Sequence, residues 1–408
     1  MFPKDEKVLQ ITKDISWIGI LDHDIVTFDV VMETRYGTTY NSYFIDAEKK
    51  AVIDTSKETF KDVYLEKIKK VVDPSKIDYI IVNHTEPDHS GNIKYLLELS
   101  PQAVVYGSRQ AINYLQEMIG KTFNSCFVKD GDTLSLGNKT LRFINAPNLH
   151  WPDTIYTYLE EDKLLFTCDS FGAHYCDEKM FDDQVGDYSE AFKYYFDVIL
   201  KPFSKFMEKA LEKIAPLDIS VICPGHGPIL RSTWKSTVDK TRKYTEIYLA
   251  DSKCEENNIL IAYVSAYGYT KQMAELIASG ISEKVDYKIN MVDLEDTLLG
   301  DLEELIVKSN SILVGSPTIN QNTLLPVYRM FALINPIRDK GKRAAAFGSY
   351  GWSGEAVKLI ENQLKSLKLN VVCEGVSARF SPENEKSEQL IDFGRKFGQV
   401  LVSQDAEK

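Results

Sequence analysis

Six consecutive residues, 84 to 89, include four side chains that can bind a metal ion. His84, Glu86, Asp88 and His89 follow directly after an apolar run at residues 80–82. A strand exposes alternate residues on one face, so a loop that leaves its end can turn imidazoles and carboxylates toward one point. Several ionisable groups buried together need a counter-charge, and a metal ion commonly supplies it. The alternative interpretation is a polar turn without a metal.

Three further candidate ligands lie at the ends of other hydrophobic runs. They are His150, within Asn-Leu-His-Trp, Asp169, within Thr-Cys-Asp, and His226, within Gly-His-Gly. A single buried histidine is more commonly a hydrogen-bonded structural residue. Four of the six histidines in the chain, however, occupy such turns together with acids. This combination predicts a metal site assembled from several strand ends.

The metal pattern resembles that of a known family. The order His-x-Glu-x-Asp-His, a distant His, an Asp and a late Gly-His-Gly is similar to the metallo-β-lactamase-type domain of flavodiiron proteins, also called A-type flavoproteins. Zinc hydrolases of that fold carry a histidine where this chain has Glu86, and a carboxylate there suits iron better than zinc. The resemblance implies one iron held by His84, Glu86 and His150, a second held by Asp88, His89 and His226, and a bridging Asp169.

The same resemblance implies two residues that line the pocket over the irons. His23 and Tyr195 stand where similar proteins place groups that donate protons or hydrogen bonds to a bound oxygen species. A histidine in a surface turn and a tyrosine that only packs are the alternative interpretations. His174 receives no role from the sequence.

The elements around the metal residues predict a layered domain. Short alternating strands are expected within residues 15–53, and a further strand at 103–106. This mixture of strands and helices is typical of a four-layer αββα sandwich. The expected helices cover residues 59–72, 93–99, 108–119 and, as one long aromatic segment, 189–214.

A second architecture begins after a polar stretch at residues 251–258. A buried strand at 259–264 leads through a turn at 265–270 into a helix at 271–281. Backbone N–H groups and the helix dipole at such a junction favour a phosphate group. The motifs GxxxxGK[ST] and GxGxxG are missing from it, which disfavours nucleoside triphosphates and NAD. Further strands, which indicate a doubly wound parallel sheet, are expected at 287–292, 311–315, 344–347 and 371–373.

This second half resembles flavodoxin, which implies bound FMN. Ser265 to Thr270 would hold the phosphate, although Tyr267 stands where flavodoxins have a threonine. Trp352 lies in a glycine-flanked loop and is expected to stack on the flavin ring, with packing on its own domain as the alternative. The expected FMN contacts are Ser265, Tyr267, Gly268, Tyr269, Thr270, Ser316, Pro317, Thr318, Asn320, Ser349, Tyr350, Gly351, Trp352 and Gly354.

Length and composition set the remaining expectations. A chain of 408 residues favours two domains, expected at 1–252 and 256–404. A net charge of −12 disfavours nucleic acids and anionic membranes as partners. Charged residues near the start and the absence of a long apolar run disfavour a signal peptide and a membrane span, which predicts a cytoplasmic protein. The six cysteines form no CxxC pair, so a fused rubredoxin is not expected.

Together the two resemblances imply an FMN- and diiron-dependent oxidoreductase that reduces O2 to water, NO to N2O, or both. Its electrons would come from an external donor such as rubredoxin or a reduced deazaflavin. Similar proteins form a head-to-tail homodimer or a dimer of dimers, with the FMN of one chain beside the irons of the other. Two alternatives stay open: a zinc-dependent hydrolase of the glyoxalase II kind fused to a flavodoxin, and a non-catalytic electron-transfer or oxygen-sensing flavoprotein.

Overall fold

The computed structural model describes residues 7–28, 32–253, 257–383 and 385–405. The chain divides into two compact units, Met1–Leu249 and Ala250–Lys408. The start of the chain and part of the polar stretch between the two halves lie outside the described residues. The division at 252 and 256 that the sequence suggests therefore stays a prediction.

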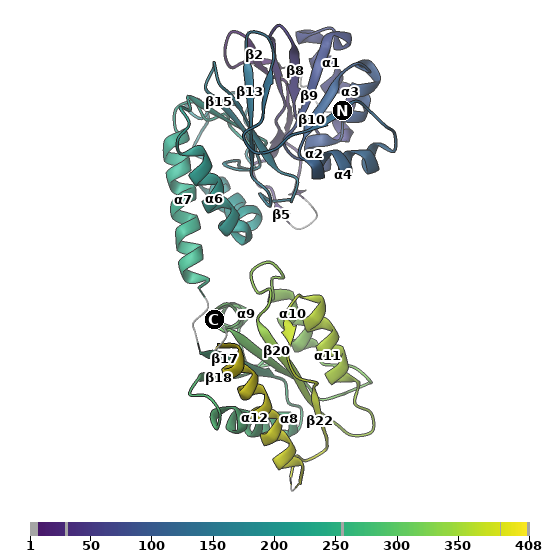
Figure 1. Ribbon diagram of the computed structural model, residues 1–408, viewed down its shortest axis with the longest axis vertical. Coiled ribbons are helices and arrows are strands. Elements are labelled where there is room, and N and C mark those ends of the chain that lie inside the picture. Colours follow the sequence, from purple (N-terminus) through teal and green to yellow (C-terminus); the bar gives the residue numbers. More distant parts are fainter. Residues whose placement is uncertain (1–6, 29–31, 254–256, 384, 406–408) are drawn as a thin grey trace. The chain divides into compact units, whose positions relative to one another are not determined.

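Unit 1 contains two larger sheets (Figure 1). One follows the order β1 (Leu9–Gln10), β2 (Ile15–Trp17), β7 (Tyr43–Ile45), β8 (Lys50–Ile53), β9 (Ile77–Val82), β10 (Val104–Gly107) and β11 (Ser125–Phe127). The other follows the order β12 (Thr133–Ser135), β13 (Thr140–Asn145), β14 (Ile155–Leu159), β15 (Leu164–Cys168) and β16 (Val221–Pro224). Two short pairs complete the strands: β3 (Ile20–Asp22) with β6 (Thr38–Tyr40), and β4 (Thr27–Phe28) with β5 (Met32–Glu33).

Alternating side chains explain why these strands form inner layers. In β9, Ile80 joins one apolar cluster and Ile81 the other, because successive residues of a strand point to opposite faces. In β15, Leu165 and Phe166 divide between the clusters in the same way. The cluster that contains Ile81 and Phe166 draws its residues from both sheets, so the sheets pack face to face.

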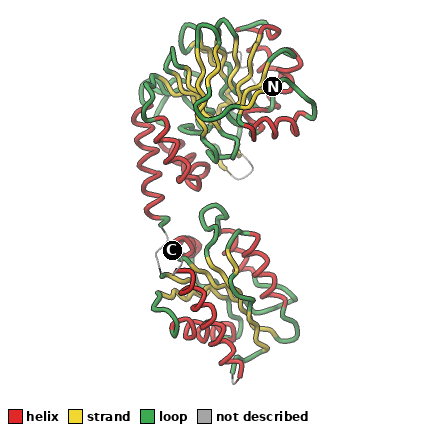
Figure 2. Tube along the Cα trace, in the orientation of Figure 1, coloured by secondary structure: helices red, strands yellow, loops and turns green. Residues whose placement is uncertain are grey.

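Helices cover the outer faces of the two sheets. Figure 2 shows them flanking the strands of unit 1. The helices on one side are α1 (Lys61–Val71), α3 (Ile93–Leu99) and α4 (Arg109–Ile119), and those on the other are α6 (Ser204–Ile214) and α7 (Trp234–Asp251). Unit 1 is thus the αββα sandwich that the sequence predicts.

The aromatic segment at 189–214 departs from the prediction of one long helix. It contains α5 (Ser189–Tyr195), a π-helical turn η3 (Phe196–Leu200), a 3-10 turn η4 (Lys201–Phe203) and α6. Pro202 lies within η4 and has no N–H to continue an α-helical ladder, so the helix is interrupted there. Helix α5 itself ends at Tyr195, where the π-helical turn begins, and the Tyr195 side chain is buried.

Unit 2 is a parallel sheet with helices on both faces. Its strand order is β18 (Lys288–Asp293), β17 (Asn258–Tyr263), β19 (Ser311–Gly315), β20 (Arg343–Tyr350) and β21 (Asn370–Val371), and β22 (Val376–Arg379) also pairs with β20. This order is the flavodoxin-like doubly wound one. Helices α8 (Tyr269–Ser282) and α12 (Glu385–Asp405) cover one face, and α9 (Leu299–Lys308), α10 (Leu325–Leu333) and α11 (Glu355–Ser366) the other.

The strand expected at 371–373 is instead divided into β21 and β22. Gly375 lies between them, and a Cβ atom at this position would come within 2.4 Å of the Val357 side chain on α11. The chain therefore passes close to the helix before it pairs with β20 again. Among the described residues, no helix combines the length and the apolar character needed to cross a membrane.

Candidate metal centre

The metal loop leaves the carboxyl end of β9 and turns at once into a short helix, α2 (Pro87–Ser90). Two neighbouring residues hold it in place. Asp54 accepts a hydrogen bond from the Asn83 N–H at 2.7 Å, and the N–H and hydroxyl of Thr55 donate to the His89 carbonyl at 2.6 and 2.8 Å. Burial raises the pKa of the Asp54 carboxyl to about 7, although nearby His89 and the Asn83 N–H oppose this rise.

The seven predicted ligands come together in two groups. One consists of His84, Glu86, His150 and Asp169, and the other of Asp88, His89 and His226; within each group, the potential ligand atoms lie within 4.8 Å of one another. Six of the seven side chains are buried, and His150 is partly exposed. The structure therefore assembles the site from the ends of β9 and β15 and from the loops that follow β13 and β16.

Asp169 lies between the two groups. Its Oδ2 is 3.5 Å from the Nε2 of His84, and its Oδ1 is 3.2 Å from the Nε2 of His89. Each carboxylate oxygen thus faces a different group, which is the geometry that a bridging ligand requires. Burial opposes the charged form of Asp169, but the imidazoles of His89 and His84 outweigh it and hold the pKa of this carboxyl well below its usual range.

The donor set fits a pair of metal ions. Among the described residues, both carboxylate oxygens of Asp88 and the Oδ2 of Asp169 are buried without a hydrogen-bond partner. Buried charged oxygens rarely lack a partner, because their desolvation is costly. Two cations, one in each group, would satisfy these oxygens and would also explain why so many imidazole nitrogens face carboxylates. Nitrogen and carboxylate ligands suit iron, manganese or zinc.

Two further residues orient the ligand histidines, and the sequence analysis missed both. The Asp153 carboxylate lies 3.2 Å from Nδ1 of His84 and accepts hydrogen bonds from the Thr85 N–H and hydroxyl at 2.7 and 2.8 Å. Nδ1 of His226 donates to the Thr39 carbonyl at 2.6 Å. Such contacts fix the tautomer and leave Nε2 for a metal. The one feature of the sequence that could have indicated this role is the position of Asp153, an acid three residues after His150.

The two predicted pocket residues occupy different environments. Tyr195 is buried, and its hydroxyl donates to Oδ1 of Asp169 at 3.0 Å. Burial, aided by the Asp169 charge, raises its pKa well above the usual value, so the hydroxyl keeps its proton. His23 is exposed in the turn after β3 and belongs to neither ligand group. Its role stays a prediction.

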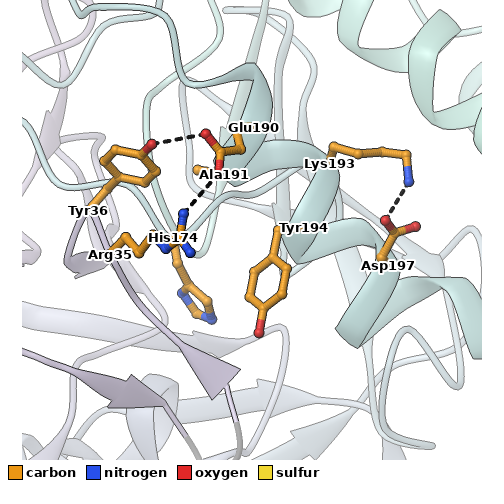
Figure 3. Close-up of a pocket in the computed structure, with 8 residues that line it drawn as sticks. All are labelled: Arg35, Tyr36, His174, Glu190, Ala191, Lys193, Tyr194 and Asp197. Atoms are coloured by element: carbon orange, nitrogen blue, oxygen red, sulfur yellow. Dashed lines mark hydrogen bonds and ion pairs between the residues drawn. The ribbon is translucent and has the colours of Figure 1, made fainter.

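A cavity of about 320 Å³ lies beside α5 (Figure 3). Arg35 and Tyr36 both reach the Glu190 carboxylate at its rim, the tyrosine hydroxyl at 3.1 Å. His174, which is only 4% exposed, also lines the cavity, and its ring packs against those of Tyr195 and His226. The cavity therefore approaches the metal centre through a residue that the sequence left without a role.

The predicted FMN residues lie in the loops that follow β17 and β19, at the start of α8, and at the end of β20 and in the loop after it. These strands are neighbours and run parallel, so their carboxyl ends meet at one edge of the sheet. The hydroxyls of Thr270, in the first turn of α8, and Ser349, near the end of β20, lie 3.0 Å apart, and Gly268 adopts the left-handed conformation before α8. Tyr267 and Trp352 are 83% and 75% exposed, so their rings are free to contact a ligand.

Comparisons with known proteins identify the same two kinds of domain. A family model described as ODP family beta lactamase matches residues 38–227, and a flavodoxin model matches residues 261–394. The flavodiiron protein of Giardia intestinalis superposes with a TM-score of 0.60 at 29% identity, covering 98% of each chain. The rubredoxin oxygen:oxidoreductase of Desulfovibrio gigas superposes with a TM-score of 0.59 at 28% identity, covering 98% of this chain and 100% of that one.

Three curated relatives extend over nearly the whole chain. The type A flavoprotein of Rhodobacter capsulatus is 40% identical, over 96% of this chain and 91% of its own length. The flavo-diiron protein FprA2 of Clostridium acetobutylicum is 41% identical, over 96% of this chain and 99% of its own length. A nitric oxide reductase of Moorella thermoacetica is 36% identical, over 95% of this chain and 97% of its own length. With both halves and their order shared, the chain belongs to the type A flavoproteins, the flavodiiron protein family.

Proposed function

We propose that this chain is an oxidoreductase that uses FMN and a pair of irons to reduce O2 to water, NO to N2O, or both. The placement of Asp169 carries the proposal, because its two carboxylate oxygens face separate groups of buried ligands. The names of two relatives support it: one is called a nitric oxide reductase and the other a rubredoxin oxygen:oxidoreductase.

The proposed assignment of ligands follows the two groups. His84, Glu86 and His150 would hold one iron, Asp88, His89 and His226 the second, and Asp169 would bridge them. When bound, FMN and the two irons supply about four electrons, enough to reduce O2 to two waters, and about two of these suffice to join two NO molecules as N2O. Zinc has no redox chemistry to contribute.

Residues around the irons would keep the ligand set charged and oriented. The buried Tyr195 hydroxyl donates to Asp169, so it stabilises the negative charge of the carboxylate that would bridge the irons. Asp153 holds the ring of His84 with Nε2 toward the metal, and the Thr39 carbonyl does the same for His226. These contacts are expected to keep the geometry of the site unchanged while electrons enter and leave it.

The flavin is proposed to occupy the loop edge of unit 2. The phosphate loop, residues 265–270, leads into α8, whose first turn offers N–H groups to an anion. Ser265 and Thr270 are the hydroxyl side chains at the two ends of this loop. The exposed ring of Trp352 would stack on the isoalloxazine.

The remaining parts of the proposal concern partners. An external donor such as rubredoxin or a reduced deazaflavin would deliver electrons to FMN, and the reaction would take place in an oxygen-sensitive cytoplasm. A head-to-tail homodimer, or a dimer of such dimers, would pass electrons from the FMN of one chain to the irons of another. The family resemblance supports this assembly.

An anaerobic reductive titration of the purified protein tests the proposal. We expect about four electrons per chain, two for FMN and one for each iron. The reduced protein should then be reoxidised by O2, NO or both, and the relative rates give its preference. Only about two electrons, with zinc found in the metal site, would contradict the proposal and favour the hydrolase of the glyoxalase II kind instead.

A further inference from the structure

His174 lies between the cavity beside α5 and the candidate metal centre. It follows Asp169 by five residues and is 4% exposed. Its ring packs against Phe28 at a centroid distance of 4.5 Å, against Tyr195 at 4.8 Å and against the ligand His226 at 5.1 Å. A polar ring thus occupies a position that an apolar side chain could fill equally well by packing alone.

Thr38 determines which nitrogen of His174 carries the proton. The Thr38 hydroxyl lies 2.9 Å from Nδ1 of His174. The neighbouring His226 does not compete for the Thr38 hydroxyl. Its Nδ1–H already donates to the Thr39 carbonyl. The other acceptor near the Thr38 hydroxyl is the Thr39 carbonyl at 3.5 Å, which is long for a hydroxyl donor. Nδ1 of His174 is therefore the best acceptor for the Thr38 hydroxyl, and we assign the hydrogen of the neutral ring to Nε2 on this basis.

This Nε2–H group has no acceptor. The atom is buried, and it finds no hydrogen-bond partner among the described residues. Bound metal ions would account for the unpaired carboxylate oxygens of Asp88 and Asp169. His174 belongs to neither ligand group, so a metal would not account for its unpaired nitrogen. A buried donor without a partner is costly, and in native proteins a ligand, an ion or an ordered water commonly completes it.

We propose that His174 donates a hydrogen bond from Nε2 to a small ligand bound at the metal pair. The ligand would be a small molecule or anion whose outer atom, the one not bound to the metal, carries negative charge. His174 would stabilise that charge without changing its own protonation, as preorganised donors do in other active sites. This inference rests on the proposed function, because it requires a metal pair that binds a ligand.

Azide is a suitable probe, since it is a small anion that binds oxidised iron. The full-length protein with its iron and FMN is titrated with azide, and the affinity is read from the absorption band of bound azide. His174→Phe keeps an aromatic ring but removes the donor, and it is expected to weaken azide binding about tenfold or more. His174→Gln places an amide N–H near the position of Nε2, and it is expected to stay within about threefold of the original protein.

A second readout separates the donor from a packing role. The infrared stretching band of bound azide should shift in His174→Phe and return toward its original position in His174→Gln, with iron and FMN contents unchanged in both. Unchanged azide affinity and frequency in His174→Phe would overturn the inference, as would an equal loss in both variants. If the original protein held no iron pair, the proposed function itself would fail, and this inference with it.

Discussion

At the residue scale, the candidate metal centre includes groups that contact its histidines without belonging to the predicted ligand set. The sequence predicts the seven ligands because chemistry restricts their types and places them directly after apolar runs. Asp153 and Thr39 could not be found in this way, since any acid or any backbone carbonyl can orient a histidine. Only the folded chain brings Asp153 to His84, from 69 residues away.

Asp153→Asn tests that orienting role. An amide oxygen accepts a weaker hydrogen bond than a carboxylate does, so the ring of His84 should be held less firmly. We expect iron affinity to fall about 10- to 100-fold, measured by competition with a chelator. Asp239→Asn, at an exposed position on α7, is the matched control and should leave the affinity unchanged. Equal affinities in the two variants would exclude a role for Asp153 in metal binding.

The metal affinity should also depend on pH through His89. Burial lowers the pKa of this imidazole, but the carboxylates of Asp88 and Asp169 outweigh burial and raise the pKa to about 9 in the metal-free protein. That proton stabilises the metal-free fold fully below the ordinary pKa of histidine, and this contribution is lost as pH rises through about 9. A metal must displace the proton before it can bind Nε2, so iron affinity should increase as pH rises.

Chelator competition at about pH 6.5, 7.5 and 8.5 measures this dependence, with an expected increase of up to about tenfold per pH unit for each proton released. His89→Gln removes the titrating ligand, so its weaker binding should vary less steeply over the same range. An affinity that falls as pH rises would contradict the assignment of His89 as a protonated residue in the metal-free site.

At the element scale, the sequence predicts most of the fold because its patterns are local. The buried strand and the helix expected at 259–264 and 271–281 form as β17 and α8, with the helix beginning two residues earlier, inside the expected turn, and the sheet of unit 2 is doubly wound as expected. Two departures have causes that periodicity alone does not resolve. Pro202 interrupts an otherwise continuous aromatic helix, and Gly375 divides the last strand where the chain passes close to α11.

The loop after β20 provides a test at this scale. Trp352→Ala removes the exposed ring proposed to stack on the flavin, and FMN affinity should fall roughly tenfold, measured by fluorescence on titration with free FMN. Trp352→Phe retains an aromatic face and should recover most of the affinity. Iron content should be the same in all three proteins, because the proposed metal ligands belong to a different unit. A parallel loss of iron would contradict independent cofactor sites.

At the scale of the whole molecule, both cofactor sites must cooperate although they belong to separate units of the chain. Two complementary variants can show whether electrons pass between chains. Asp169→Asn removes the charge of the carboxylate proposed to bridge the irons and leaves the flavin loops intact. Ser265→Asp places a negative charge in the phosphate loop and should prevent FMN binding by repulsion. Each variant alone should lack most of the reductase activity.

Co-expression of the two variants then distinguishes the two routes. In a mixed head-to-tail dimer, the intact flavin of one chain would serve the intact irons of the other, so activity should reappear at a substantial fraction of the original. Transfer within a single chain would leave every flavin paired with a damaged metal centre, and the mixture would stay inactive. Differently tagged chains allow the mixed dimer to be purified before the assay, so that recovered activity belongs to one defined particle. A fully active monomer would contradict the dimer more directly, because no second chain would then supply the missing site.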